Sequence, residues 1–170
     1  MSQFVPYGLY KVKDSYFKDF PSPNDRYVHN KGENRPYYIA LVDKNGLMWL
    51  LPLSTQVDNY KSKIAADEAR YGQCTYYHLI TFMGEEKVVL IKNLIPVLPE
   101  YIAGEFTIAK QHYVIRNKAE IKEIQTRFSK YLALVRAKKI HPPVDILATE
   151  RRLLARLQSR KPRKTLARSR

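Results

Sequence analysis

The sequence predicts an α+β fold in which a compact, barrel-like antiparallel β-sheet is flanked by helices and followed by C-terminal helices. Two patterns predict this fold, and they meet near residue 115. Before that point, short apolar runs alternate with turn residues, which is typical of antiparallel strands. After it, apolar residues recur at three- and four-residue steps, which is typical of helices. A chain of 170 residues that is 45% apolar is long enough for one domain with a hydrophobic core.

The first elements are expected to be short. In chain order we predict a strand at Leu9–Val12, one or two helical turns at Asp14–Phe20, a polar loop at Pro21–Pro36, and a hairpin at Tyr37–Val42 and Leu47–Leu53. Pro21 and Pro23 stop the helical turns because proline cannot continue a helix. Asn45-Gly46 closes the hairpin, since this pair is a strong turn signal. A loop as long as residues 21–36 is often functional in a compact domain.

The middle of the chain predicts one helix and further strands. We expect a helix at Asp58–Tyr71, a second hairpin at Tyr76–Met83 and Lys87–Ile91, and short strands at Asn93–Val97 and Phe106–Ile108. Asp58 can cap the start of the helix, and Gly72 suits its exit. In the pairs Tyr37-Tyr38 and Tyr76-Tyr77, strand alternation predicts one ring inward and one outward.

The last third of the chain predicts two helices and a tail. The first has an apolar face formed by Ile121, Ile124, Phe128, Tyr131, Leu132 and Val135. Its opposite face is basic and includes Lys118 and Lys122, which are either phosphate contacts or an ordinary solvated surface. Pro142 and Pro143 end this helix and start the next one. We predict a single domain over residues 1–158 and a basic, mobile tail over residues 159–170.

The charge of the chain indicates a polyanionic partner. Thirty Lys and Arg against sixteen Asp and Glu give a formal charge of +14. Residues 1–85 carry ten basic and nine acidic side chains, whereas residues 86–170 carry twenty basic and seven acidic ones. A one-sided positive field attracts phosphate backbones, so RNA is the expected partner. No apolar stretch is long enough to span a bilayer, and the N-terminus does not resemble a signal peptide. Neither a membrane partner nor secretion is therefore expected.

Several kinds of chemistry are not expected from the residues present. A single cysteine, Cys74, excludes an internal disulfide and a cysteine-based zinc site, and it fits a reducing cytoplasm. The four histidines are far apart, and the acidic residues form no obvious cluster for two-metal chemistry. We therefore expect no metal site and no cofactor. RNA cleavage without metal is chemically reasonable, because the 2′-hydroxyl of RNA can itself attack the adjacent phosphate.

Two segments are candidates for such a site. Ser54 and Thr55 end a predicted strand just before a helix, where adjacent hydroxyls and free backbone N–H groups can bind a phosphate oxygen. Lys61 lies in the first turns of that helix, close to Tyr60 and Lys63. The ordinary alternative for the hydroxyl pair is helix capping.

The second candidate segment is the loop before the strand at Tyr37. It contains His29, Lys31 and Arg35, and Arg35 can pair with phosphate oxygens in a bidentate manner. The ordinary alternative is a polar connection in which Glu33 neutralises one cation. His78, in a predicted strand, is either a base-contacting or supporting residue or a buried histidine.

These residues resemble a known family. Segments Gly8–Val12 and Tyr37–Val42, and above all Trp49–Thr55, resemble the ribonuclease toxins of type III toxin–antitoxin systems, which include ToxN, AbiQ and CptN. Segments Asn30–Pro36 and Val57–Lys61 are most similar to the CptN branch. The resemblance covers about residues 8–157.

The resemblance implies a barrel-like sheet similar to that of MazF and Kid, and a metal-independent endoribonuclease that acts on cellular or phage RNA. It implies an RNA antitoxin, cut by the toxin into pseudoknots that occupy its groove, in a closed toxin–RNA assembly. The family's hydroxyl pair corresponds to Ser54 and Thr55. Val57 stands where ToxN has its catalytic lysine, so that role passes to Lys61, with Lys63 as the alternative. The upstream lysine corresponds to Lys31, with Arg35 as its rival.

Two other functions fit the same composition. A non-catalytic RNA-binding module would use the same charge and aromatic residues without a hydroxyl–lysine site. A MazF-like toxin would be restrained by a protein antitoxin instead of an RNA. Cleavage products separate the first alternative from an endoribonuclease, and the genes next to the coding sequence separate the second.

Overall fold

Strand β3 (Met48–Ser54) lies at the centre of the sheet in the computed structural model, which describes residues 4–23 and 26–160. All seven of its residues are buried, as expected for a run of apolar side chains covered on both faces. The first part of β3 pairs with β2 (Tyr37–Val42) and β6 (Ile95–Val97). Its last two residues, Leu53 and Ser54, pair instead with β5 (Glu85–Leu90). The end of β3 is therefore placed beside β5.

Over residues 4–23 and 26–160, the main sheet has seven strands and is antiparallel throughout. Its order is β4 (Tyr77–Phe82), β5, β3, β2, β1 (Leu9–Val12) and β7 (Ile102–Glu105), with β6 paired to β3. A separate two-stranded ribbon consists of β8 (Thr107–Ile108) and β9 (Gln111–His112). The predicted α+β class and antiparallel sheet are confirmed. Among the described residues, no pairing joins the edge strands β4 and β7, so the sheet is not a closed barrel.

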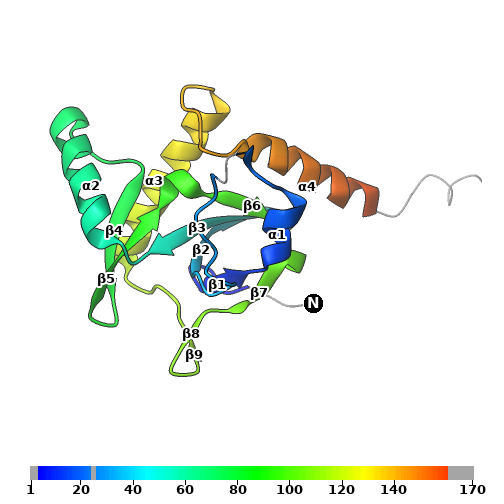
Figure 1. Ribbon diagram of the computed structural model, residues 1–170, viewed down its shortest axis with the longest axis horizontal. Coiled ribbons are helices and arrows are strands. Elements are labelled where there is room, and N and C mark those ends of the chain that lie inside the picture. Colours follow the sequence, from blue (N-terminus) through cyan, green and yellow to red (C-terminus); the bar gives the residue numbers. More distant parts are fainter. Residues whose placement is uncertain (1–3, 24–25, 161–170) are drawn as a thin grey trace, which may run out of the picture.

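In the part of the chain that the structure describes, the α-helices are α1 (Asp14–Asp19), α2 (Val57–Tyr71), α3 (Lys118–Arg136) and α4 (Ile146–Arg160). Helix α3 buries Ile124, Phe128, Tyr131, Leu132 and Val135, which confirms the predicted apolar face. Helix α2 stands at one side against β4 and β5, and α4 packs against β6 at the other (Figure 1). None of the described helices is long and apolar enough to cross a membrane.

The two tyrosines of β2 differ from the prediction, because Tyr37 and Tyr38 are both buried. The hydroxyl of Tyr38 bonds to Gln125 of α3 (2.9 Å), and the hydroxyl of Tyr37 donates to Asn30 (3.2 Å). Strand β2 is thus covered on one face by a helix and on the other by a loop. Strand alternation places the two rings on opposite faces, but it cannot show that both faces are covered.

Two helix boundaries also differ from the prediction, and strand β7 was not predicted. Helix α2 begins at Val57 with Gln56 at its N-cap, and Asp58 lies in the first turn without acting as the cap. Helix α4 continues through Arg160, so the predicted tail begins inside a helix. Arg156 and Arg160 both pair with Glu100 (3.2 and 2.6 Å), which holds this last turn. The rest of the predicted tail lies outside the described residues. Strand β7 was missed because its sequence, Ile-Ala-Gly-Glu, carries little strand signal.

Candidate active site

The candidate hydroxyl pair lies where β3 ends and α2 begins. Ser54 is buried, and its Oγ accepts a hydrogen bond from the Gln56 N–H at 3.1 Å. This bond shapes the turn between the strand and the helix, which is a common role for serine. Thr55 is exposed, because the turn directs it away from the sheet. Of the two predicted hydroxyls, that of Thr55 is therefore available to a ligand, and that of Ser54 positions the turn.

The loop that carries Lys31 is fixed by a buried asparagine. The Asn30 side chain donates to Val12 O (2.9 Å) and to Asp14 Oδ1 (2.8 Å), and it accepts from the Tyr37 hydroxyl. Lys31, Gly32 and Glu33 then have φ values of 54°, 60° and 70°. Left-handed backbone is unfavourable for lysine and glutamate, and it persists only where surrounding contacts impose it. This turn holds Lys31 in a defined, exposed position.

Arg35 links this loop to the end of β3. It is only 6% exposed. Its Nε donates to His29 O, and its Nη1 donates to Leu53 O. Burial lowers the pKa of its guanidinium from the usual range. The sequence predicts that Arg35 contacts RNA, whereas the structure uses its guanidinium to join two backbone segments on either side of the site.

An open pocket of about 370 Å³ brings three of the predicted residues together. Lys31, Ser54 and Thr55 line it, and they are joined by Asn34, Glu85 and Lys87. Burial, together with the positive charges of Arg35 and Lys87, lowers the pKa of Lys31. Lys87 Nζ also lies 3.0 Å from Glu85 Oε2. The pocket therefore combines two neighbouring lysines with an accessible hydroxyl, which is a suitable set of groups for a phosphate.

Lys87 is a site residue that the sequence analysis missed. It lies in β5 immediately before Val88, which is the strand partner of Ser54. This pairing brings residues 54 and 87 into one pocket although they are far apart in the chain. An isolated lysine at the start of a predicted strand gave no signal, because only the strand pairing shows its neighbour.

Other predicted site residues lie outside the lining of this pocket. Lys61 Nζ is 2.8 Å from Glu86 Oε1, on the outer side of α2 and β5, where both side chains are 47% exposed. Tyr60 packs on Tyr77 with ring centroids 4.8 Å apart, and Lys63 Nζ lies 5.0 Å from the Tyr60 ring. The remaining residues are His29 beside Lys31, and Lys118 and Lys122 on the exposed face of α3. Their predicted roles in RNA binding stay predictions.

His78 joins β4 to α3 rather than facing the pocket. Its Nε2 lies 3.1 Å from Glu120 Oε1, and the side chain is 13% exposed. Burial lowers the pKa of His78 below its ordinary value of 6.5, although the Glu120 carboxylate acts in the opposite direction. The position fits a supporting residue, which was one of the alternatives that the sequence left open.

This histidine predicts a pH dependence of stability. The unfolded chain binds a proton at His78 more readily than the folded chain, so its contribution is present above pH 6.5 and is lost as the pH falls through the lower folded-state pKa. His78→Gln should flatten this part of the curve of unfolding free energy against pH, as measured by urea denaturation. His141→Gln, at an exposed histidine, is the matched control. Equal curves for His78→Gln and wild type would contradict the expectation.

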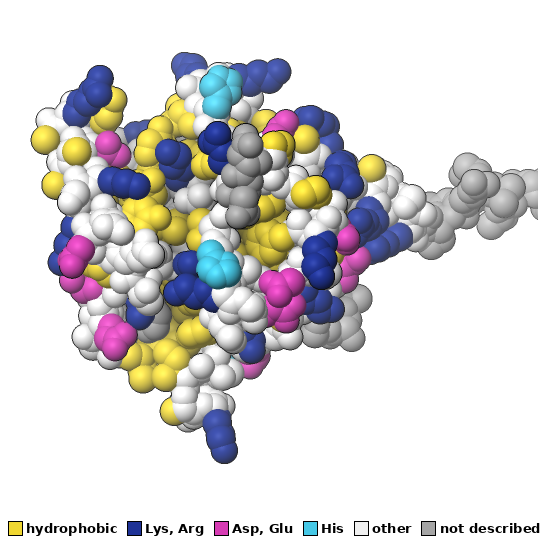
Figure 2. Space-filling model, viewed as in Figure 1, with side chains coloured by type: hydrophobic (Ala, Val, Ile, Leu, Met, Phe, Trp, Pro, Cys, Tyr) yellow, Lys and Arg dark blue, Asp and Glu magenta, His cyan; other side chains and the backbone are white. Residues whose placement is uncertain are grey.

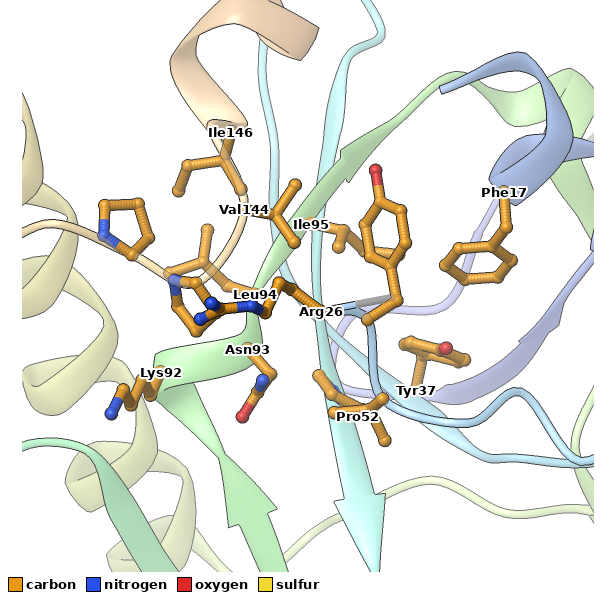
Figure 3. A pocket seen from close by; sticks show the side chains of 14 residues that line it. Phe17, Arg26, Tyr37, Pro52, Lys92, Asn93, Leu94, Ile95, Val144 and Ile146 are labelled. Carbon is orange, nitrogen blue, oxygen red and sulfur yellow. The ribbon is translucent and has the colours of Figure 1, made fainter. Parts of the chain in front are cut away.

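A second pocket lies between β3, β6 and the segment that leads into α4 (Figure 3). Its cavity volume is only about 10 Å³, and most of its lining is apolar, including Phe17, Tyr37, Pro52, Ile95 and Val144. Lys92 lies at its edge with Nζ 5.3 Å from the Tyr76 ring. The residues that line it do not combine a serine or threonine hydroxyl with a lysine. The pocket at the end of β3, which combines Lys31 and Lys87 with Thr55, is the candidate active site. Within residues 4–23 and 26–160, no cluster of three or more potential metal ligands occurs.

The chain has the fold of a type III toxin–antitoxin endoribonuclease. One solved structure that shows this fold is that of AbiQ, described as a lactococcal anti-phage endoribonuclease belonging to the type III toxin–antitoxin system. The TM-score is 0.65, and the alignment covers 92% of this chain and 100% of AbiQ at 17% sequence identity. Comparison with protein-family models gives no match, and comparison with curated proteins gives no significant match. The predicted resemblance is thus confirmed for the fold.

Proposed function

We propose that this protein is a metal-independent endoribonuclease toxin of a type III toxin–antitoxin system. The observation that carries the proposal is the pocket at the end of β3, where Lys31, Thr55 and Lys87 line one opening. The AbiQ-like fold supports the same activity. The net charge of +14 supports an RNA substrate, since a positive field attracts the phosphate backbone.

The proposed reaction uses a nucleophile that the RNA supplies. The 2′-oxygen attacks the adjacent phosphorus and loses its proton, while the bond from phosphorus to the 5′-oxygen breaks and that oxygen gains a proton. The products are a 2′,3′-cyclic phosphate and a 5′-hydroxyl. Thr55 donates its hydroxyl proton in a hydrogen bond to a non-bridging phosphate oxygen. Lys31 and Lys87 stabilise the negative charge that grows on the phosphorane, which is where fixed cations lower a barrier most.

The resemblance assigns the role of the second catalytic cation to Lys61, whereas the pocket lining favours Lys87 for that role. The two are adjacent to the same hairpin, because Lys61 pairs with Glu86 and Lys87 follows Glu86 in β5. We assign the second cation to Lys87, since it lines the pocket with Thr55. The variants described in the Discussion separate the two assignments.

An RNA antitoxin is the proposed inhibitor. A structured RNA whose end lies in the pocket would block the same phosphate site that a substrate uses. His29 beside the pocket, and Lys118 and Lys122 on α3, are proposed to hold its backbone, because exposed cations bind phosphates independently of sequence. A closed assembly in which toxin and RNA alternate is part of this proposal.

The proposal predicts cleavage that survives removal of divalent ions. Purified protein in EDTA should cut single-stranded RNA and leave 2′,3′-cyclic phosphate ends, identified by mass spectrometry. A DNA of the same sequence, and an RNA with a single 2′-deoxynucleotide at the cleaved position, should stay intact because neither can supply the nucleophile there. Binding of RNA without any cleavage would instead indicate a non-catalytic RNA-binding module, and cleavage of the DNA would exclude the proposed mechanism.

A further inference from the structure

The candidate active site has a second half that the proposed chemistry does not use. Besides the lysines, the pocket is lined by a set of apolar side chains, called here the apolar floor, formed by Pro36, Leu53, Met83, Phe106 and Ile108. Hydrophobic side chains gather on this face between the β4–β5 hairpin and the β8–β9 ribbon, next to a group of Lys and Arg side chains (Figure 2). A phosphate needs no apolar surface, so the floor points to another part of the ligand.

Two residues of the apolar floor are held rigidly by the backbone around them. The Phe106 N–H donates to Leu9 O (2.9 Å), and Phe106 O accepts from the Tyr113 N–H (3.0 Å). Ile108 follows two residues later and pairs with Gln111 in the β8–β9 ribbon. Residues two apart in an extended segment point to the same side, so Phe106 and Ile108 present one continuous surface. Both are half-buried and pack against the core.

Met83 is the most exposed residue of the apolar floor. Met83 is 63% exposed and lies in the turn of the β4–β5 hairpin with a φ of 54°. Methionine is unbranched and adapts to the shape of a flat ligand. The apolar floor therefore combines an exposed methionine with a half-buried aromatic ring in the lining of one open pocket.

We propose that the apolar floor binds one unpaired nucleobase, that of the nucleotide next to the scissile phosphate. When Lys31 and Lys87 bind a phosphate, the base of the adjoining nucleotide is within reach of the pocket lining. A base has two apolar faces and is attached to an anion, and the pocket offers an apolar surface beside cations in the same arrangement. Stacking of bases on aromatic side chains is the usual way in which single-stranded RNA is held.

The base subsite has a measurable consequence. Once the cleaved bond is mapped, the base on either side of it is replaced in turn by an abasic residue, in an RNA made uncleavable by a 2′-deoxynucleotide at that bond. For wild type, one of the two abasic RNAs should bind about ten- to a hundredfold more weakly than the intact RNA. Phe106→Ala should bind the intact RNA more weakly by a similar factor and should no longer distinguish it from that abasic RNA.

Two control variants distinguish an effect on folding from an effect on base stacking. Phe106→Leu retains apolar packing against the core but removes the ring, so it should fold as wild type and still lose most of the discrimination. Tyr71→Ala removes an aromatic residue that is 65% exposed at the end of α2, and it should retain the full discrimination. Wild type that binds both abasic RNAs as tightly as intact RNA would overturn the inference, as would full discrimination by Phe106→Leu.

The inference rests on the proposed function, and the two fail in different ways. Base-dependent binding of the uncleavable RNA without cleavage of its all-ribose counterpart would remove the catalytic proposal and leave the base subsite. In that case the RNA position to be tested is mapped by protection of the bound RNA from a probe nuclease. Cleavage without any dependence on a flanking base would leave the catalytic proposal and remove the subsite.

Discussion

Lys31→Ala should lower the single-turnover rate of RNA cleavage by about a hundred- to a thousandfold at saturating enzyme, the usual cost of removing one group that stabilises transition-state charge. The reason is that Lys31 is one of two lysines lining the pocket that contains Thr55. Its side chain is exposed, so the variant should fold normally. The left-handed turn that presents it is held by Asn30 and does not depend on the ammonium group.

The controls for this prediction also decide which lysine is the second cation. Lys87→Ala should cause a loss of similar size, whereas Lys61→Ala should remove only an exposed ion pair with Glu86 and change the rate little. Lys44→Ala, in the turn at the opposite end of β3, should leave cleavage unchanged. A large loss for Lys61→Ala with little loss for Lys87→Ala would restore the assignment made from the resemblance.

Arg35→Ala should destabilise the protein by about 2–4 kcal/mol, because it leaves two carbonyl oxygens without a buried charged donor. Those carbonyls belong to His29 and Leu53, so the loss acts on the loop and on the end of β3 together. Cleavage by the folded fraction should fall as well, since Lys31 and Thr55 are carried by these two segments. Urea denaturation followed by fluorescence of Trp49 measures the first effect, and single-turnover cleavage measures the second.

Replacing Arg35 by lysine separates the effect of the charge from that of the hydrogen-bond geometry. Arg35→Lys keeps the charge but cannot donate from two fixed nitrogens in one plane, so it should recover little of the lost stability. Arg151→Ala, at an exposed arginine of α4, should change the unfolding free energy by less than about 0.5 kcal/mol. If Arg35→Ala unfolded like wild type but bound RNA much more weakly, Arg35 would be a contact residue, as the sequence predicted.

The elements that the sequence predicted well are those with a strong local pattern. The apolar face of α3 follows from residues three and four positions apart. The β2–β3 hairpin follows from its turn, in which Gly46 has a φ of 90°. Local geometry determines these features, so a short window of sequence is enough to predict them.

The residues of the candidate site also fall into those that local sequence reveals and those that only long-range pairing reveals. Ser54, Thr55 and Lys31 were found because a hydroxyl pair at a strand end and a cationic loop are recognisable in the chain, and the pocket contains all three. Lys87 and the apolar floor were not found, because residues 54, 87 and 106 meet through the pairing of β3 with β5 and the placement of β8. The buried role of Arg35 was not visible either, since a guanidinium that bonds to backbone carbonyls looks the same in sequence as one that binds phosphate.

The sequence by itself determined the α+β class, the order of most elements, the positive charge of the second half, and the segment that ends at Thr55. These depend on periodicity, turn residues and composition, which are properties of neighbours along the chain. Only the tertiary structure decided which lysine shares a pocket with Thr55, that Tyr37 and Tyr38 are both covered, and that the pocket has an apolar half. These depend on which strands pair and which faces are buried, and long-range pairing leaves no periodic trace in the residues that it brings together.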